Sequence, residues 1–94
     1  PGYRHFIIRP KPGGSLTWAK GSYHSINGKI ESDWNLEGNH FTLDIYIPVN
    51  TTATVYVPMM GKQRKVQEKG IKFIKYEEGN AIYFVQSGSY RLTN

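Results

Sequence analysis

Residues 30–47 have the sequence IESDWNLEGNHFTLDIYI, in which apolar and polar side chains alternate on both sides of a Gly38-Asn39 pair. A period of two is typical of strands with one buried face, and a leading glycine suits a two-residue hairpin turn of type II′. A one-residue slip in this hairpin would move every side chain to the opposite face. A turn at 38–39 predicts three apolar pairs on one face: Leu36 with Phe41, Trp34 with Leu43, and Ile30 with Ile47.

Short runs rich in β-branched and aromatic residues continue outward from this hairpin, separated by Gly and Pro roughly every eight to twelve residues. No window shows the 3.6-residue apolar spacing of a long helix. The chain of 94 residues is therefore expected to be all-β, an antiparallel β-sandwich of about eight strands forming one domain over residues 1–94. The expected strands are 3–9, 16–20 running into 22–26, 29–36, 41–47, 53–57, 71–76, 81–86 and 90–92.

The first hairpin is expected to turn at Asn27-Gly28, the strongest short-range turn signal in the chain. The last hairpin is expected across residues 77–80. A two-residue turn at 27–28 places Gly21 opposite Trp34, Tyr23 opposite Ser32, and His24 opposite Glu31.

Composition restricts the classes of function. The chain has no cysteine, which excludes disulfides, thiolate catalysis and zinc–cysteine sites. It has no apolar run near 18 residues, so no membrane span is expected. Pro1 is followed by no signal-like segment, so we expect a piece of a longer protein whose compartment stays open.

The net charge is +5, which permits an anionic partner without requiring one. Half of the basic residues lie between Lys62 and Lys75. A nucleic-acid groove would place aromatic rings on the same face, but Phe73 belongs to the core by alternation. A solvated loop and an edge strand are the preferred interpretation, and no nucleic-acid partner is expected.

Few residues could carry chemistry. Glu31 and Asp33 share one face of a strand, and the hairpin sets Asp33 opposite Asp44. Such a pair could share a proton or hold a cation, although two surface carboxylates beside a compensating lysine are the preferred interpretation. The three histidines have no metal-ligand spacing, and no nucleophile elbow or phosphate-binding loop occurs. No metal, cofactor or catalytic residue is expected.

Four aromatic residues are candidates for contact with a sugar or a neighbouring domain. Tyr46 and Tyr56 fall on the outward phase of their strands, and Trp18 lies near a loop. Exposed rings can stack on the C–H faces of sugars, and they can equally pack on another domain. His5 stands near the expected junction with the rest of the protein, where an interdomain contact is plausible. The Asn50-Thr51-Thr52 sequon is interpreted as a turn.

Several segments together resemble the C-terminal domain of bacterial alpha-L-rhamnosidases of glycoside hydrolase family 78. They are PGYRHFIIRPKPGG at 1–14, LTWAKGSY at 16–23, GKIESDW at 28–34 and IPVNTTATVYVP at 47–58. The resemblance implies a bacterial glycosidase that removes terminal alpha-L-rhamnose with inversion, using a general acid and a general base. It also implies that both carboxylates lie in an (α/α)6 barrel outside this chain.

The leading expectation is therefore a non-catalytic accessory sandwich that packs on that barrel and stabilises it. The alternative is an independent carbohydrate-binding module that uses Trp18, Tyr46 and Tyr56, with rhamnose-containing glycosides as ligands. An anion binder that uses the basic segment and an enzyme in its own right are the remaining classes.

Overall fold

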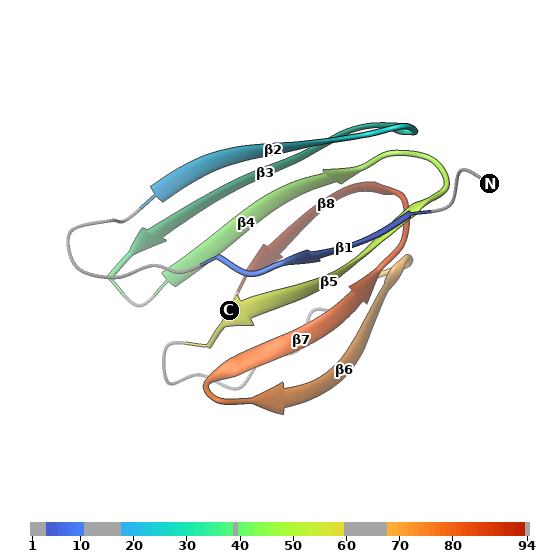
Figure 1. Cartoon of the computed structure of the whole chain (residues 1–94). Helices are drawn as coiled ribbons and strands as arrows, with labels where there is room; N and C mark the ends of the chain where they lie inside the picture. The colour runs from blue at the N-terminus through green and yellow to red at the C-terminus, as the bar shows by residue number, and fades with distance from the viewer. Residues whose placement is uncertain (1–3, 11–17, 39, 60–67, 94) are drawn as a thin grey trace.

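The computed structural model describes residues 4–10, 18–38, 40–59 and 68–93, which form two stacked β-sheets (Figure 1). Sheet I has the strand order β1-β5-β7-β6, and sheet II has the order β2-β3-β4-β8. No described segment forms a helix that is long and apolar enough to cross a membrane. The strands are β1 Arg4–Ile8, β2 Trp18–Ser25, β3 Gly28–Glu37, β4 His40–Ile47, β5 Thr51–Pro58, β6 Ile71–Glu77, β7 Asn80–Val85 and β8 Gly88–Thr93.

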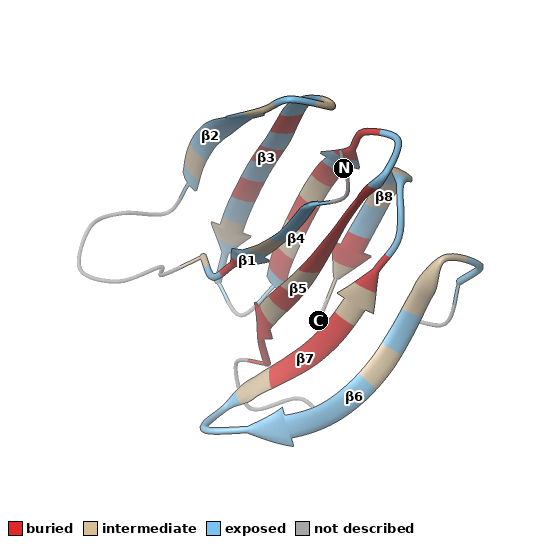
Figure 2. Ribbon diagram, turned by 45° about the vertical axis from the view of Figure 1, so that its right-hand side comes forward, coloured by how far each residue is buried: buried red, intermediate tan, exposed pale blue. Residues whose placement is uncertain are grey.

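The hairpin of β3 and β4 has the predicted register. Leu36 pairs with Phe41, Trp34 pairs with Leu43, and Glu37 pairs with His40 at the end of the hairpin. Gly38 has a φ of 61°, a left-handed conformation that suits glycine and that the primed hairpin turns require. The alternating burial along both strands confirms that one hydrophobic pattern sets the register (Figure 2).

The predicted register of the β2–β3 hairpin is wrong by two residues. The turn lies at Ile26-Asn27, and Ser25 pairs with Gly28. The Ser25 hydroxyl accepts a hydrogen bond from the Asn27 N–H at 3.2 Å and donates one to the Gly28 carbonyl at 2.8 Å. The Asn27 side-chain amide also donates to the Asn50 carbonyl at 3.0 Å, which ties this turn to the β4–β5 connection.

Because the shift is an even number of residues, each side chain keeps its predicted face. The partners do change, and His24 lies opposite Lys29 instead of Glu31. Ala19 lies opposite Trp34, Gly21 opposite Ser32 and Tyr23 opposite Ile30.

One strand pair departs from the antiparallel prediction. β1 pairs with β5 in parallel, from Arg4 opposite Thr51 to Ile8 opposite Val55. The chain leaves sheet I after β1, builds the three strands β2 to β4 of sheet II, and returns as β5. Such a long crossover permits a parallel pair, whereas a short hairpin requires an antiparallel one.

The remaining hairpin prediction is confirmed. β6 and β7 are joined at Glu78-Gly79, where φ is 49° and 80°, so both residues have the positive φ of a type I′ turn. β6 is an edge strand with a bulge between Phe73 and Lys75. Of the basic segment between Lys62 and Lys75, residues 62–67 lie outside the described residues, as do residues 3 and 16–17 of the expected strands.

The core lies between the two sheets. Its largest fully buried side chains are Tyr83 and Phe41, and Trp34 stacks on Phe41 with ring centroids 5.8 Å apart. Both sheets contribute to one cluster, so the sandwich packs around a single core. The cluster comprises Ile8, Ile30, Trp34, Phe41, Leu43, Ile45, Ile47, Ala53, Val55, Val57, Met59, Ala81, Tyr83, Val85 and Leu92.

Candidate functional site

The outer face of sheet I is organised around His5. Its ring Nδ1 lies 2.7 Å from the Thr52 hydroxyl, and its Nε2 lies 2.8 Å from the Thr54 hydroxyl. In a neutral ring one nitrogen donates and the other accepts, and a hydroxyl can take either role. The ring also stacks on Phe84 of β7, with centroids 5.8 Å apart and planes 12° apart. His5 thereby links three strands of the sheet across this face.

The same face carries apolar side chains on three of its strands. Ile82 points outward from β7 but is only 3% exposed, and Phe84 is half-buried beside it. Tyr56 of β5 pairs with Ile82, and the guanidinium of Arg9 lies 4.0 Å from the centre of its ring. Ile7 stands on edge strand β1 with 66% of its surface exposed. On this face Ile7 lies opposite Thr54 of β5, and His5 and Arg9 precede and follow it by two residues along the chain.

A groove of about 690 Å³ continues this face toward edge strand β6. Phe73, Ile74 and Phe84 supply its apolar lining, and Lys72 stands at its side. The pair formed by Lys75 and Glu77, at 2.7 Å, is exposed on the same strand. A hydrogen bond from Lys75 lowers the pKa of Glu77, and Glu77 in turn raises the pKa of Lys75.

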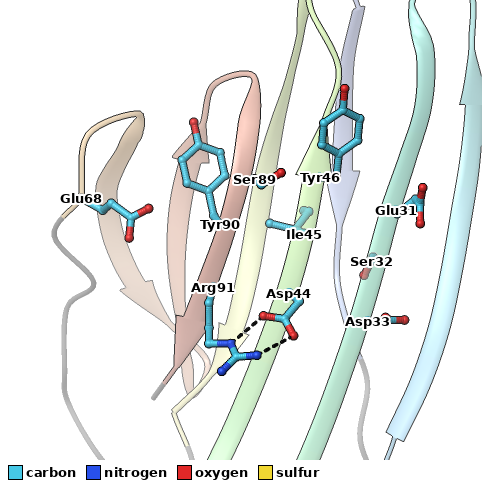
Figure 3. Close-up of a pocket in the computed structure, with 10 residues that line it drawn as sticks. All are labelled: Glu31, Ser32, Asp33, Asp44, Ile45, Tyr46, Glu68, Ser89, Tyr90 and Arg91. Atoms are coloured by element: carbon cyan, nitrogen blue, oxygen red, sulfur yellow. Dashed lines mark hydrogen bonds and ion pairs between the residues drawn. The ribbon is translucent and has the colours of Figure 1, made fainter.

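The outer face of sheet II is different in chemistry. Its β3 and β4 residues are Glu31, Asp33 and Asn35 opposite Tyr46, Asp44 and Thr42. Arg91 of β8 donates two hydrogen bonds to Asp44, from Nε to Oδ1 at 2.7 Å and from Nη2 to Oδ2 at 3.1 Å (Figure 3). Asp44 raises the pKa of the Arg91 guanidinium through these bonds. Arg91 thus compensates Asp44, and Lys20 of β2 lies directly opposite Asp33 on the same face.

Two shallow hollows adjoin on this face and share Asp33, Asp44 and Arg91. The first has a volume of about 400 Å³ and includes Tyr46, and the second has a volume of about 360 Å³ and includes Trp18. Among the described residues, no group of three or more His, Asp or Glu side chains has an arrangement that could hold a metal ion.

The four candidate residues fall on opposite faces of the molecule. His5 and Tyr56 lie on the outer face of sheet I, whereas Trp18 and Tyr46 lie on the outer face of sheet II. Trp18 and Tyr46 are 60% and 44% exposed, but Tyr56 is half-buried beneath Arg9. The structure therefore does not join the three aromatic candidates in one row.

Two parts of these faces were not predicted. Phe84 and Ile82 were missed, although the unbroken apolar run at 81–85 is typical of a strand covered on both faces. Arg91 was missed because its partner Asp44 is 47 residues away, and only the pairing of β4 with β8 brings them together.

Comparison with known proteins identifies the family to which the chain belongs. The model of the bacterial alpha-L-rhamnosidase C-terminal domain matches residues 1–72. An alpha-L-rhamnosidase of Streptomyces avermitilis is 39% identical over 92 residues, covering 98% of this chain and 9% of that protein. An alpha-L-rhamnosidase of Formosa agariphila is 27% identical over 96 residues, covering 95% of this chain and 10% of that protein.

The solved structures that resemble this chain are also alpha-L-rhamnosidases. The crystal structure of Streptomyces avermitilis alpha-L-rhamnosidase complexed with L-rhamnose superposes with a TM-score of 0.84 at 37% identity, over 99% of this chain and 9% of that one. The alpha-L-rhamnosidase from Dictyoglumus thermophilum superposes with a TM-score of 0.71 at 29% identity, over 93% of this chain and 10% of that one. The chain thus spans about a tenth of the length of the relatives it matches. It belongs to the family of bacterial alpha-L-rhamnosidase C-terminal domains.

Proposed function

We propose that residues 1–94 form one non-catalytic accessory domain of a larger alpha-L-rhamnosidase. The domain packs on the catalytic barrel of the same polypeptide through the outer face of sheet I and stabilises that barrel. The barrel hydrolyses terminal alpha-L-rhamnose, as the resemblance to the family implies. His5 and Tyr56 belong to the packing face.

The observation that carries this proposal is the chemistry of the outer face of sheet I. In a sandwich that meets water on both sides, outward residues are polar and alternate with the core residues. β7 instead has Ile82 and Phe84 on its outward phase, and β1 adds the exposed Ile7. Of these, Ile7 and Phe84 leave apolar surface open to solvent, and exposed apolar surface of this kind is typical of an interaction site. In the related alpha-L-rhamnosidases, about nine-tenths of the chain lies outside the part that matches this domain. A corresponding remainder of the same polypeptide is the partner that we propose.

The carboxylates support the non-catalytic part of the proposal. Inverting glycoside hydrolysis needs a protonated acid on one side of the bond and a base that activates water on the other. Asp44 is instead held in a two-point ion pair with Arg91. Asp33 and Glu31 line a shallow, open hollow, and within the described part of the chain this surface does not enclose a bond away from water. None of these three groups is placed as an acid–base pair.

A chromogenic alpha-L-rhamnoside tests the proposal. We expect no hydrolysis by the 94-residue chain, and normal kcat by the full-length enzyme. A full-length enzyme from which this domain is deleted should keep its kcat before heating but lose activity faster at elevated temperature. Turnover by the 94-residue chain would overturn the non-catalytic assignment. Equal heat inactivation with and without the domain would overturn the stabilising role.

A further inference from the structure

The outer face of sheet II presents two aromatic rings to solvent on a surface that is otherwise polar. Trp18 projects from β2 opposite Asn35, and Tyr46 projects from β4 opposite Glu31, so both lie on the side away from the core. Single exposed rings are common on proteins. Two rings on one face, each beside its own hollow, give a ligand two apolar platforms.

The spacing of the rings suits a ligand longer than one sugar ring. The positions of Trp18 and Tyr46 are four residues apart along β3 and two strands apart across the sheet. With normal strand dimensions, they are about 13 Å apart along the strands and about 10 Å apart across them. An extended ligand that touches both rings must cross the residues between them.

Those residues are the hydrogen-bonding groups that sugar hydroxyls require. Asp33 and Asn35 lie between the rings on β3. Within the described part of the chain, Asp33 makes no hydrogen bond or ion pair, so its carboxylate is free to accept from hydroxyl groups. Arg91 is held in place by its two bonds to Asp44 and has a further nitrogen, Nη1, to donate. A group fixed before binding loses less conformational entropy when the ligand arrives.

The charge of this face selects against anionic ligands. The residues that line the two hollows include four carboxylates, against the two cations Lys20 and Arg91. The chain as a whole has a net charge of +5, so the lining of the two hollows is opposite in sign to the molecule, while Lys29 of β3 adds a cation elsewhere on the same face. The carboxylates here would repel a polyanion, whereas the lysines of β6, in the other sheet, would attract it. The four carboxylates are Glu31, Asp33, Asp44 and Glu68.

From these observations we propose that the outer face of sheet II binds a neutral oligosaccharide. Trp18 and Tyr46 stack on its sugar rings, and Asp33, Asn35 and Arg91 hydrogen-bond its hydroxyl groups. The face lies opposite the packing face of sheet I, so the site does not rest on the proposed function. It stays accessible when sheet I is covered.

Tryptophan fluorescence of the 94-residue chain tests this proposal, because Trp18 is exposed and Trp34, the other tryptophan, is buried. Titration with cellohexaose and with L-rhamnose should shift the emission of Trp18, with the hexasaccharide binding more tightly. Trp18→Phe should abolish the shift, since the ring of Trp34 is buried in the core against Phe41. Tyr46→Leu and Asp33→Asn should each weaken binding about tenfold, the loss expected for one stacking or charged hydrogen-bonding contact.

Tyr56→Leu is the matched control, because this ring lies on the opposite sheet. It should leave the dissociation constant unchanged. Two-dimensional amide NMR shows that each variant is folded and maps the contacted residues. The same substitutions in the full-length polypeptide, assayed by retardation in a gel that contains soluble hydroxyethyl cellulose, give a second measurement.

Three results would overturn the proposal. The first is the absence of both an emission shift and retardation with the neutral probes. The second is chemical-shift changes confined to sheet I. The third is tighter binding of oligogalacturonate than of cellohexaose, which would replace the neutral ligand by an anionic one. None of these results bears on whether sheet I packs on the barrel.

Discussion

Replacing Ile7 by threonine tests whether the outer face of sheet I packs on the barrel or is ordinary solvent-exposed surface. Ile7 is 66% exposed on sheet I, so most of its apolar surface contributes nothing to the fold of this chain. Burying an isoleucine side chain fully contributes about 1.5–3 kcal/mol, and the exposed two-thirds therefore offers about 1–2 kcal/mol to a docked partner. Threonine keeps the β-branch and the strand preference but loses most of that contribution.

The matched control is Ile26→Thr. Ile26 is 69% exposed, but it lies in the β2–β3 turn, away from the outer face of sheet I. In the separate 94-residue chain, both substitutions should change stability by less than about 0.5 kcal/mol, as is usual for surface sites. In the full-length enzyme only Ile7→Thr should favour the undocked domain, by a factor of about 5–30.

Limited proteolysis of the full-length enzyme measures that equilibrium. When docking is fast relative to cleavage, the rate of cutting between domain and barrel follows the undocked population. We expect the rate for Ile7→Thr to rise about 5–30-fold over the parent enzyme. Equal rates for the two variants, or a larger effect of Ile26→Thr, would refute the assignment of sheet I as the packing face.

Two further predictions concern the fold. Gly70→Ala should lower the urea midpoint more than Gly79→Ala. Both glycines have positive φ, which costs about 1–2 kcal/mol with a side chain, but of the two only Gly70 would bring a Cβ into collision with the Tyr90 hydroxyl. Burial raises the pKa of Tyr90, so the folded state holds this proton more tightly than the unfolded state does. The stability that this provides is complete below pH 10.0, the ordinary pKa, and is lost as pH rises through the folded value. Tyr90→Phe should flatten the fall of the urea midpoint between pH 9 and pH 11, whereas an unchanged slope would contradict it.

The features of this fold that depend on local sequence patterns were predictable, whereas those that depend on contacts between distant residues were not. The β3–β4 register followed from six apolar residues because a wrong register would expose them. The β2–β3 register did not follow from Asn27-Gly28, because the Asn27 amide reaches the Asn50 carbonyl of a different connection. The parallel pair of β1 with β5 was missed for the same reason, since no local signal records which distant strand lies beside an edge.

The candidate site was predictable only in part. Outward phase was correct for Tyr46, which is exposed, but it did not show that Arg9 covers Tyr56. Nor could the sequence show that the three aromatic candidates would fall on different sheets. The order of strands in each sheet decides which outward residues become neighbours, and that order is a property of the whole chain.

The strands of the two sheets differ in the residues that they turn away from the core. β3 and β4 alternate strictly, so their outward residues are Glu31, Asp33, Asp44 and others that water can solvate. β7 is apolar in both phases, with Ile82 and Phe84 outward, whereas β5 has threonines and Tyr56 outward; both strands are largely buried within this chain itself. Strands that are apolar in both phases are typical of sheets covered on both sides. This pattern supports the proposed packing of sheet I on the barrel, which would leave the polar, aromatic face of sheet II to meet a ligand.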